Sequence, residues 1–200
     1  MLLHALMPAS RANGPGLRGV GWFQGCSLGC DGCFNRRTHV FHGPEVQAED
    51  VARRIIECDA CHDPAGVTFS GGEPMQQATA LLTIVCELRR RSPKLSLGMF
   101  TGYTKRELDQ GAFFCRPGAP GIARIRLWQT IRGHLDFAIM GRYNRAQASH
   151  ESICSSRNQV LRLFSDRYTI DDFGPPEVEV IIAEDGRTQI TRFPVLGAPA

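Results

Sequence analysis

The sequence predicts an α/β protein with a mostly parallel sheet, and three observations lead to this fold class. Short apolar segments alternate with helical patterns between residues 20 and 140. Gly- and Pro-containing turns separate them, and such an alternation gives parallel strands joined by right-handed crossovers. A chain of 200 residues with 42% hydrophobic residues can bury one sizeable core, so we expect a single domain over residues 1–200.

The composition argues against several classes of partner. The 23 basic and 20 acidic residues leave a net charge of +3, which is too small to favour nucleic acid or a membrane surface. No apolar run reaches the ~20 residues of a membrane-spanning helix, and the N-terminus lacks the basic region of a signal peptide. Eight cysteines without an export signal are typical of a reducing compartment. We therefore expect a cytoplasmic protein whose cysteines are thiols or metal ligands.

The first segments lead into a cysteine-rich loop. Residues 2–7 are expected to form a short strand, and residues 12–18 a turn, because two glycines flank a proline there. Residues 20–23 are apolar, as in a buried strand. This strand delivers the chain into the loop at 25–35, and ligand loops commonly follow the C-terminal ends of strands in α/β folds.

Helical and strand patterns then alternate. A helix is expected over about 48–58, where apolar residues fall on one face. A strand is expected at 66–69, followed by an amphipathic helix that ends in the basic run at 89–91. The next strand is expected at 95–100.

The remaining segments are less regular. We expect, in order, a short helix from about 105, a Gly- and Pro-rich loop at 111–121, a helix at 122–131 and a strand at 135–140. Residues 142–156 are polar and irregular. Alternating apolar residues at 160–164 and 178–182 predict two more strands.

Three cysteines, Cys26, Cys30 and Cys33, stand close together in the spacing C-x3-C-x2-C. Three thiols are an odd number for disulfides and one fewer than a closed tetrahedral zinc site requires. They can hold a cube-shaped iron–sulfur cluster by three of its four irons and leave the fourth iron open. These cysteines are therefore the candidate metal ligands.

A second motif, Ser70-Gly71-Gly72-Glu73-Pro74, follows the strand at 66–69. Two glycines at a strand end expose backbone N–H and C=O groups to a ligand lying over that end, and Glu73 adds a carboxylate. In isolation the pentapeptide is explained as a strand-to-helix turn with Glu in the first helical turn. About 40 residues after three clustered cysteines, it indicates a binding site.

Together, these motifs resemble the radical S-adenosylmethionine superfamily. Other segments are similar to activating proteins of glycyl-radical enzymes, in particular those of anaerobic ribonucleoside-triphosphate reductases. The segments that carry the resemblance are Asn13 to Arg18, the cysteine loop through Asn35, Ser70 to Pro74, Thr101 to Tyr103, Asp136 to Gly141 and Ser155 to Gln159. The resemblance covers a core of about 12–165 and leaves 166–200 as a C-terminal extension.

The resemblance implies two cofactors, a [4Fe–4S] cluster on Cys26, Cys30 and Cys33 and S-adenosylmethionine on the open iron. One electron from the cluster then cleaves S-adenosylmethionine to methionine and a 5′-deoxyadenosyl radical. In this family the radical abstracts a hydrogen atom from a glycine Cα of a partner enzyme. No side chain beyond the cluster ligands is expected to be catalytic, because the cofactors carry the chemistry.

The resemblance also implies a set of cofactor contacts. They are Gly32, Cys33, Phe34, Asn35, Ser70, Gly71, Gly72, Glu73 and Asp136. The motif at 70–73 is expected to receive the methionine end, and residues 32–34 to neighbour the adenine, while Asn35 hydrogen-bonds near the cluster. Phe34 is also explained as a core aromatic residue, and Asp136 as a strand carboxylate near a helix terminus.

A protein substrate requires an open site, because a glycine loop has to reach the 5′ carbon. We therefore expect a partial, open (β/α) barrel. The expected partners are a glycyl-radical enzyme and a one-electron donor such as flavodoxin or ferredoxin.

The chain departs from the subgroup at several positions. Met140 stands before Gly141, where an Asp-Gly pair is usual. Cys154 replaces the glycine of a Gly-Ser-Ser-Asn-Gln motif, into which Arg157 is inserted, and the segment 111–130 is longer than usual. These departures lie outside the cysteine loop, so they bear on the partner more than on the chemistry.

Other interpretations use the same residues. A radical enzyme acting on a different glycyl-radical enzyme, a peptide or a small molecule would keep every candidate residue. A zinc-binding interaction module could add His39 or His42 to the three cysteines, but it leaves the motif at 70–74 unexplained. A ferredoxin-like carrier would need a fourth nearby cysteine. The pair Cys58 and Cys61 is either a second metal site or, more simply, two ordinary thiols.

Overall fold

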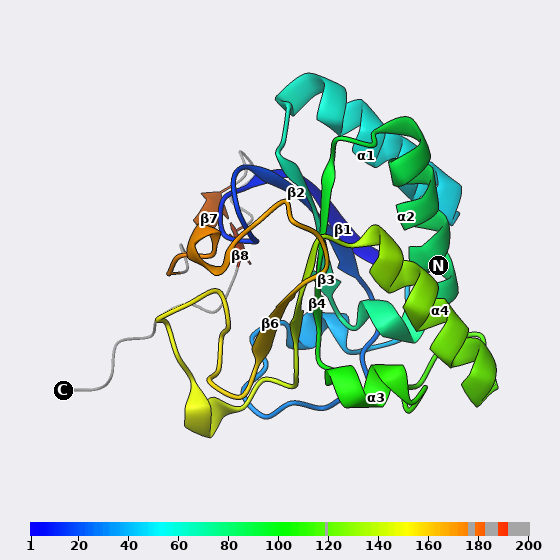
Figure 1. Cartoon of the computed structure of the whole chain (residues 1–200), viewed down its shortest axis with the longest axis vertical. Helices are drawn as coiled ribbons and strands as arrows, with labels where there is room; N and C mark the ends of the chain where they lie inside the picture. The colour runs from blue at the N-terminus through cyan, green and yellow to red at the C-terminus, as the bar shows by residue number, and fades with distance from the viewer. Residues whose placement is uncertain (119, 176–178, 183–187, 192–200) are drawn as a thin grey trace.

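In the computed structural model, six strands form one mixed sheet in the order β1-β2-β3-β4-β5-β6 (Figure 1). The structure describes residues 1–118, 120–175, 179–182 and 188–191. The central strands β2 (Arg18–Phe23), β3 (Gly66–Gly71), β4 (Ser96–Thr101) and β5 (Phe137–Met140) are parallel. The edge strands β1 (Leu3–Ser10) and β6 (Val160–Leu163) are antiparallel to their neighbours. The predicted mostly parallel α/β sheet is confirmed, and within the described residues it is not closed.

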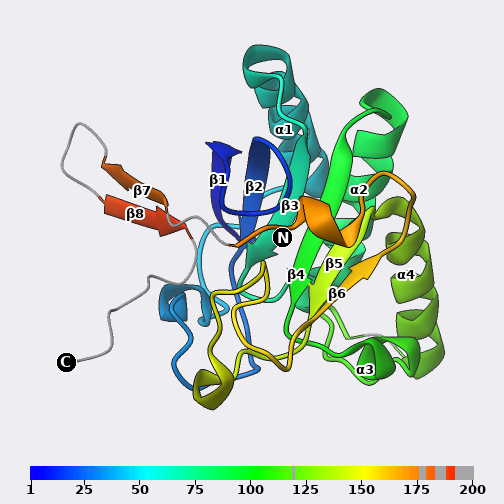
Figure 2. The same ribbon diagram turned by 60° about the vertical axis from the view of Figure 1, so that its left-hand side comes forward.

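Three long helices cover one face of the sheet. Helices α1 (Ala48–His62), α2 (Ala78–Arg91) and α4 (Gly121–His134) lie side by side (Figures 1 and 2). Because the parallel strands follow one another in sequence order, right-handed crossovers place all their helices on the same face. The short helix α3 (Lys105–Asp109) follows β4, and its Thr104 and Glu107 form a capping box.

The main core lies between these helices and the sheet. In α2, the apolar residues Leu81, Ile84, Val85 and Leu88 recur at helical spacing and are completely buried. Strand β5 is buried on both faces, which explains its uninterrupted apolar sequence. Ala138 and Met140 join the main core, while Phe137 and Ile139 join a smaller cluster with Ile153 and Phe173 on the other face.

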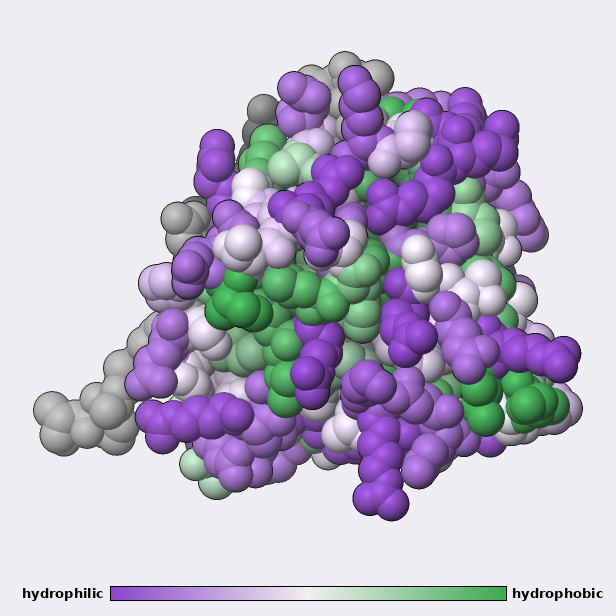
Figure 3. Space-filling view, in the orientation of Figure 1, coloured by the Kyte–Doolittle hydropathy of each residue, from purple (hydrophilic) through white to green (hydrophobic). Residues whose placement is uncertain are grey.

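The face seen in Figure 3 is mostly polar, with apolar areas near the middle of the view and at its lower right. Edge strand β6 is only partly covered, and Val160 is 44% exposed. Among the described residues, no helix is long and apolar enough to cross a membrane.

A separate hairpin follows the main sheet. Its strands β7 (Glu179–Ile182) and β8 (Thr188–Thr191) pair antiparallel (Figure 2). Glu179 anchors it by accepting hydrogen bonds from the Ser10 Oγ at 2.5 Å and the Arg11 N–H at 2.6 Å.

The predicted elements are present, with different ends. The helix expected at 48–58 continues to His62, and the helix expected at 122–131 occupies Gly121–His134. The strand expected at 178–182 corresponds to β7, although residue 178 lies outside the described residues, as does residue 119 of the predicted loop. Strand β8 was not predicted. Parts of the expected C-terminal extension, at 176–178, 183–187 and 192–200, also lie outside the described residues.

Parallel strands end at the same edge of the sheet, and this edge positions the site. Strands β3, β4 and β5 end at Gly71, Thr101 and Met140, and the cysteine loop follows β2. Loops at the carboxyl edge of a parallel sheet are where ligands bind in α/β folds.

Candidate functional site

The cysteine loop is held in place mainly by backbone hydrogen bonds. The Gly25 N–H donates to the Thr38 carbonyl at 2.7 Å, and the Cys26 N–H donates to the His39 carbonyl at 3.0 Å. Within the loop, the Cys33 N–H donates to the Cys30 carbonyl at 3.2 Å. The segment between β2 and residues 38–39 is therefore a loop closed by backbone hydrogen bonds, which leave the cysteine side chains available to bind a ligand.

The double glycine at the end of β3 brings that strand end against the cysteine loop. The Gly72 N–H donates to the Phe23 carbonyl at 2.8 Å, and the Glu73 N–H donates to the Gly25 carbonyl at 2.9 Å. A Cβ on Gly72 would lie only 2.3 Å from the Gly25 carbonyl oxygen. Gly71 has a φ of +103°, which glycine adopts readily and other residues rarely do. The two motifs found in the sequence therefore contact each other directly.

Gln76 ties the following turn to the same loop. Its Oε1 accepts from the Ser27 N–H at 2.9 Å, and its Nε2 donates to the Ser27 Oγ and the Tyr103 hydroxyl, each at 2.8 Å. Gln76 is completely buried, so these bonds satisfy an amide that has no access to water. These bonds attach the cysteine loop to Gln76, which follows β3, and through Gln76 to Tyr103, which follows β4.

Glu73 is a buried carboxylate at the end of β3. Its Oε1 accepts from the Met75 N–H at 2.9 Å and from the Thr101 hydroxyl at 2.8 Å, and its Oε2 accepts from the Gly102 N–H at 2.7 Å. Burial raises the pKa of Glu73 to about 7, against the opposing effect of these donors. Three accepted bonds leave one of the roughly four lone-pair sites of a carboxylate for a further donor.

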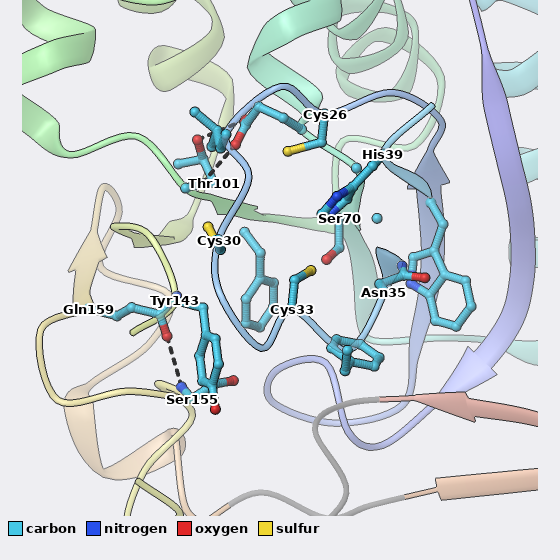
Figure 4. A pocket seen from close by; sticks show the side chains of 18 of the residues that line it. Cys26, Cys30, Cys33, Asn35, His39, Ser70, Thr101, Tyr143, Ser155 and Gln159 are labelled. Atoms are coloured by element: carbon cyan, nitrogen blue, oxygen red, sulfur yellow. Dashed lines mark hydrogen bonds between the residues drawn. The ribbon is translucent and has the colours of Figure 1, made fainter. Parts of the chain in front are cut away.

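A single cavity joins these features (Figure 4). Cys26, Cys30 and Cys33 line it, together with Phe34, Asn35 and the motif from Ser70 to Glu73. Trp22, Leu28 and Phe100 add apolar walls, and Thr101 and Gly102 lie at the end of β4. The cavity thus combines thiols, an acidic group, backbone polar groups at a strand end and aromatic surface.

Two predicted contacts do not line the cavity. Gly32 faces the Arg145 side chain, since a Cβ there would lie 3.1 Å from the Arg145 Cδ. Asp136 precedes β5 and therefore lies at the opposite, amino-terminal end of that strand. There it accepts hydrogen bonds from Arg89 and from the Leu97 N–H, each at 2.8 Å, and from the Ser165 hydroxyl at 2.6 Å.

The electrostatics of Asp136 fit a structural role. Burial alone would raise its pKa, but the hydrogen bonds from Ser165, Arg89 and the Leu97 N–H outweigh it and lower the pKa. The interpretation of Asp136 as a strand carboxylate near a helix end agrees with this position, because Arg89 comes from the last turn of α2.

Several residues in the cavity had no assigned role from the sequence. Asn13, Tyr143, Ser155 and Gln159 line it, and His39, considered only for a zinc site, lines it as well. Asn13, Ser155 and Gln159 fall within segments that carried the family resemblance. That resemblance was the only available signal, because their distance from the cysteines in sequence hides their proximity in space.

The cysteine sulfurs bind a metal as thiolates, and a nearby positive charge favours that form. Burial raises the pKa of the Cys26 thiol to about 12 and also raises that of Cys33. A metal centre in the cavity would reverse this effect, because thiolates are the metal-binding form. Among the described residues, no three Cys, His, Asp or Glu side chains converge closely enough to hold one metal ion.

Comparison with known proteins identifies similar chains. Over 170 residues, the chain is 27% identical to the anaerobic ribonucleoside-triphosphate reductase-activating protein of Vibrio cholerae, covering 82% of this chain and 99% of the relative. The protein of the same name from Escherichia coli K12 is 29% identical over 113 residues, which is 54% of this chain and 73% of the relative. A pyruvate formate-lyase-activating enzyme of Clostridium pasteurianum is 36% identical over 86 residues, covering 42% of this chain and 36% of that enzyme.

A family profile matches most of the chain. The profile describes a 4Fe-4S single cluster domain and matches residues 12–162. This segment contains the three cysteines, the strand-end motif and the cavity-lining residues up to Gln159. By its sequence, and with three thiols around one cavity, the chain belongs to the 4Fe-4S single cluster domain family.

Proposed function

We propose that this chain is a radical S-adenosylmethionine enzyme that generates a glycyl radical on a partner enzyme. One observation carries the proposal: three thiols of a C-x3-C-x2-C loop share a cavity with a buried carboxylate at an open strand end. The family match and the names of the similar proteins support the same function.

The donor set fits a [4Fe–4S] cluster held by Cys26, Cys30 and Cys33. Three thiolates leave one iron of such a cluster without a protein ligand. The zinc module uses the same three cysteines, but it leaves the strand-end motif at 70–74 without a role. His39 lines the cavity and His42 does not.

The residues also suit S-adenosylmethionine, which carries an ammonium group, a carboxylate and an adenine. When bound, the two cofactors supply reductive cleavage of S-adenosylmethionine and a 5′-deoxyadenosyl radical that abstracts a hydrogen atom. Glu73 has one acceptor site left for the ammonium group, and the polar backbone at 70–72 lies beside it. Phe34 and Asn35 form the part of the cavity suited to the adenine.

The protein's own residues bind and orient these groups. The strand-end contacts of Gly72 and Glu73 with the cysteine loop fix the carboxylate relative to the three sulfurs. Trp22, Leu28 and Phe100 limit water around the reacting centre. Under this proposal, Gly32 serves as a turn residue next to Cys33, and Asp136 is no longer among the cofactor contacts.

The substrate is a protein under this proposal. The names of several relatives point to anaerobic ribonucleoside-triphosphate reductase as the partner, and their alignments cover more of this chain than the alignment to the pyruvate formate-lyase-activating enzyme. Because the chain is also similar to a pyruvate formate-lyase-activating enzyme, another glycyl-radical enzyme is the second candidate for the partner. A partial, open (β/α) barrel remains part of the proposal, supported by the open sheet with its helices on one face.

The proposal also includes an electron donor, a cellular location and a domain arrangement. A flavodoxin or ferredoxin is proposed as the one-electron donor, and the cytoplasm as the location, because reduced thiols need a reducing compartment. The family match over 12–162 supports a core of about 12–165 and an extension at 166–200 within one domain.

Anaerobic reconstitution tests the proposal. The full chain is loaded with iron and sulfide, reduced with dithionite in the presence of S-adenosylmethionine, and assayed for 5′-deoxyadenosine. We expect product from the wild type, none from Cys30→Ala, and wild-type yield from Cys86→Ala, whose thiol is exposed and outside the cavity. Folded wild-type protein that takes up zinc but forms no cluster and no product would overturn the proposal.

A further inference from the structure

Residues 141–159 form a closed loop, here called the wall loop, at the end of β5. Its two ends are joined by side chains: Asn158 Nδ2 donates to the Arg142 carbonyl at 2.8 Å, and Ser156 Oγ accepts from the Asn144 N–H at 3.2 Å. The Arg157 N–H donates to the Gln147 carbonyl at 2.8 Å. The loop is thus an ordered structure rather than an irregular connection.

Gln159 is the central residue of this closure. Its Nε2 donates to the Gly141 carbonyl at 2.9 Å, where the chain leaves β5. Its Oε1 accepts from the Ser155 N–H at 2.9 Å and from the Ser156 N–H at 3.2 Å. One amide therefore holds the start of the loop and the Ser155 backbone in fixed relation to each other.

The wall loop supplies one side of the cavity. Tyr143, Ser155 and Gln159 lie together there, while Cys26, His39 and Ser70 lie on the other side (Figure 4). The loop also reaches the cysteine loop, because the Arg145 side chain lies against Gly32. Residues 145–148 are exposed, so this side of the cavity adjoins solvent.

Ser155 offers a hydroxyl at this wall. Its N–H and carbonyl make the contacts with Gln159 and with the Ser149 N–H. In the described part of the chain, its Oγ makes no hydrogen bond, although the residue is half-buried and lines the cavity. A hydroxyl in this position can both donate to and accept from a ligand.

The geometry points to the Ser155 hydroxyl as a contact for the backbone of the substrate's glycine-bearing segment, with Gln159 as its positioning residue. This inference rests on the proposed function. A glycine has no side chain to recognise, so its placement depends on the N–H and C=O groups of the adjoining peptide units. The cysteine loop and strand-end motif hold the cofactors, and the wall next to solvent is left for the incoming chain.

Deuterium transfer tests the inference. The probe is the anaerobic ribonucleoside-triphosphate reductase of Vibrio cholerae, produced with [2,2-²H₂]glycine and mixed with the reconstituted full chain, dithionite and S-adenosylmethionine. In the productive reaction one electron from dithionite breaks the S–C5′ bond. One deuterium atom then moves from the glycine Cα to C5′, which leaves the unpaired electron on the glycine. Mass spectrometry gives the deuterated fraction of 5′-deoxyadenosine.

We expect Ser155→Ala to lower the deuterated fraction by about fivefold, the effect of losing one hydrogen bond, and Gln159→Leu, which loses three, to lower it at least as much. Their affinity for S-adenosylmethionine, measured by calorimetry, should stay within about twofold of wild type. Asn158→Ala is the matched control, because it removes a hydrogen bond of the same loop from an exposed side chain outside the cavity. Its deuterated fraction should equal that of the wild type.

The outcomes separate the inference from the proposed function. An unchanged deuterated fraction in Ser155→Ala overturns the inference, and that variant loses no hydrogen bond needed for folding. A parallel loss of S-adenosylmethionine affinity also overturns it, because the wall would then contact the cofactor. Wild-type 5′-deoxyadenosine without deuterium would contradict the proposed partner itself.

Discussion

Gly72 shows how a single residue couples the two motifs. The sequence suggested that the double glycine exposes backbone to a ligand, and the structure adds that Gly72 packs on the Gly25 carbonyl. No side chain fits between them, because a Cβ would approach that oxygen to 2.3 Å. This close approach fixes the position of the cysteine loop relative to the carboxylate of Glu73.

Gly72→Ala is therefore predicted to displace the cysteine loop and to reduce the iron retained after anaerobic reconstitution. Gly133→Ala is the matched control, since a Cβ at Gly133 in α4 meets no atom within 4 Å. That variant should retain wild-type iron and gain up to about 1 kcal/mol in helix stability. Iron analysis and thermal unfolding check both, and full iron content in Gly72→Ala would contradict the packing argument.

Asp136 illustrates a carboxylate whose hydrogen-bond partners only the structure reveals. It stands at the amino-terminal end of β5 and joins Arg89, Ser165 and the backbone of β4. We predict that Asp136→Asn lowers the free energy of unfolding by about 2 kcal/mol, because a buried, hydrogen-bonded ion pair loses its charge. The affinity for S-adenosylmethionine should not change.

Chemical denaturation and calorimetry test this prediction together. Asp50→Asn is the control, because its ion pair with Arg53 is exposed and contributes little to stability. A loss of S-adenosylmethionine affinity in folded Asp136→Asn, with little change in stability, would restore Asp136 as a cofactor contact.

Among the elements, helix α3 is attached to the wall loop by one ion pair. Glu107 caps α3 through Thr104 and pairs with Arg142 at 2.9 Å. The hydrogen bond from Arg142, aided by Thr104, lowers the pKa of Glu107 from 4.5 to about 2. Because the folded-state pKa lies below the unfolded value, this stabilisation is fully present above pH 4.5 and is lost as the pH falls toward 2.

Glu107→Gln is predicted to cost about 1 kcal/mol at pH 7, a value reduced for the partial exposure of the pair. The difference from wild type should shrink between pH 4.5 and pH 2. Urea denaturation at several pH values measures it, with Glu87→Gln, in an exposed pair with Arg90, as a nearly neutral control. A cost that does not depend on pH would exclude the ionised carboxylate as its source.

Element prediction from sequence was accurate where patterns are local. The periodicity of α2 and the apolar run of β5 identified these elements, because burial on one or both faces leaves a direct trace in the sequence. The ends of α1 and α4 were less accurate, since the residues beyond the predicted ends carry no clear stop signal. The antiparallel pairing of β6 follows from contacts between distant segments, which no local pattern records.

At the scale of the whole molecule, the sheet order brings the site together. Strands β2 to β5 follow one another in the sheet, so the loops after them meet at one edge. The three cysteines and the motif at 70–73 were identifiable because each is compact in sequence. Tyr143, Ser155 and Gln159 reach the same cavity only through the fold, and their position in its wall therefore required the structure.

The hairpin of β7 and β8 lies beyond the family match at 12–162. Glu179 links it to Ser10, and the Asn13 side chain, which lines the cavity, donates to the same Ser10 Oγ at 2.7 Å. Two hydrogen bonds thus connect an element outside the matched segment to the wall of the cavity.

The measurement that tests the central claim most directly is electron paramagnetic resonance of the partner. The reconstituted chain, dithionite and S-adenosylmethionine are mixed anaerobically with the Vibrio cholerae reductase, and the spectrum is recorded after freezing. We predict a glycyl-radical signal that requires all three components and disappears with Cys30→Ala. A cluster that is formed and reduced, with 5′-deoxyadenosine produced but no glycyl radical on the reductase, would contradict the claim that this chain activates that enzyme.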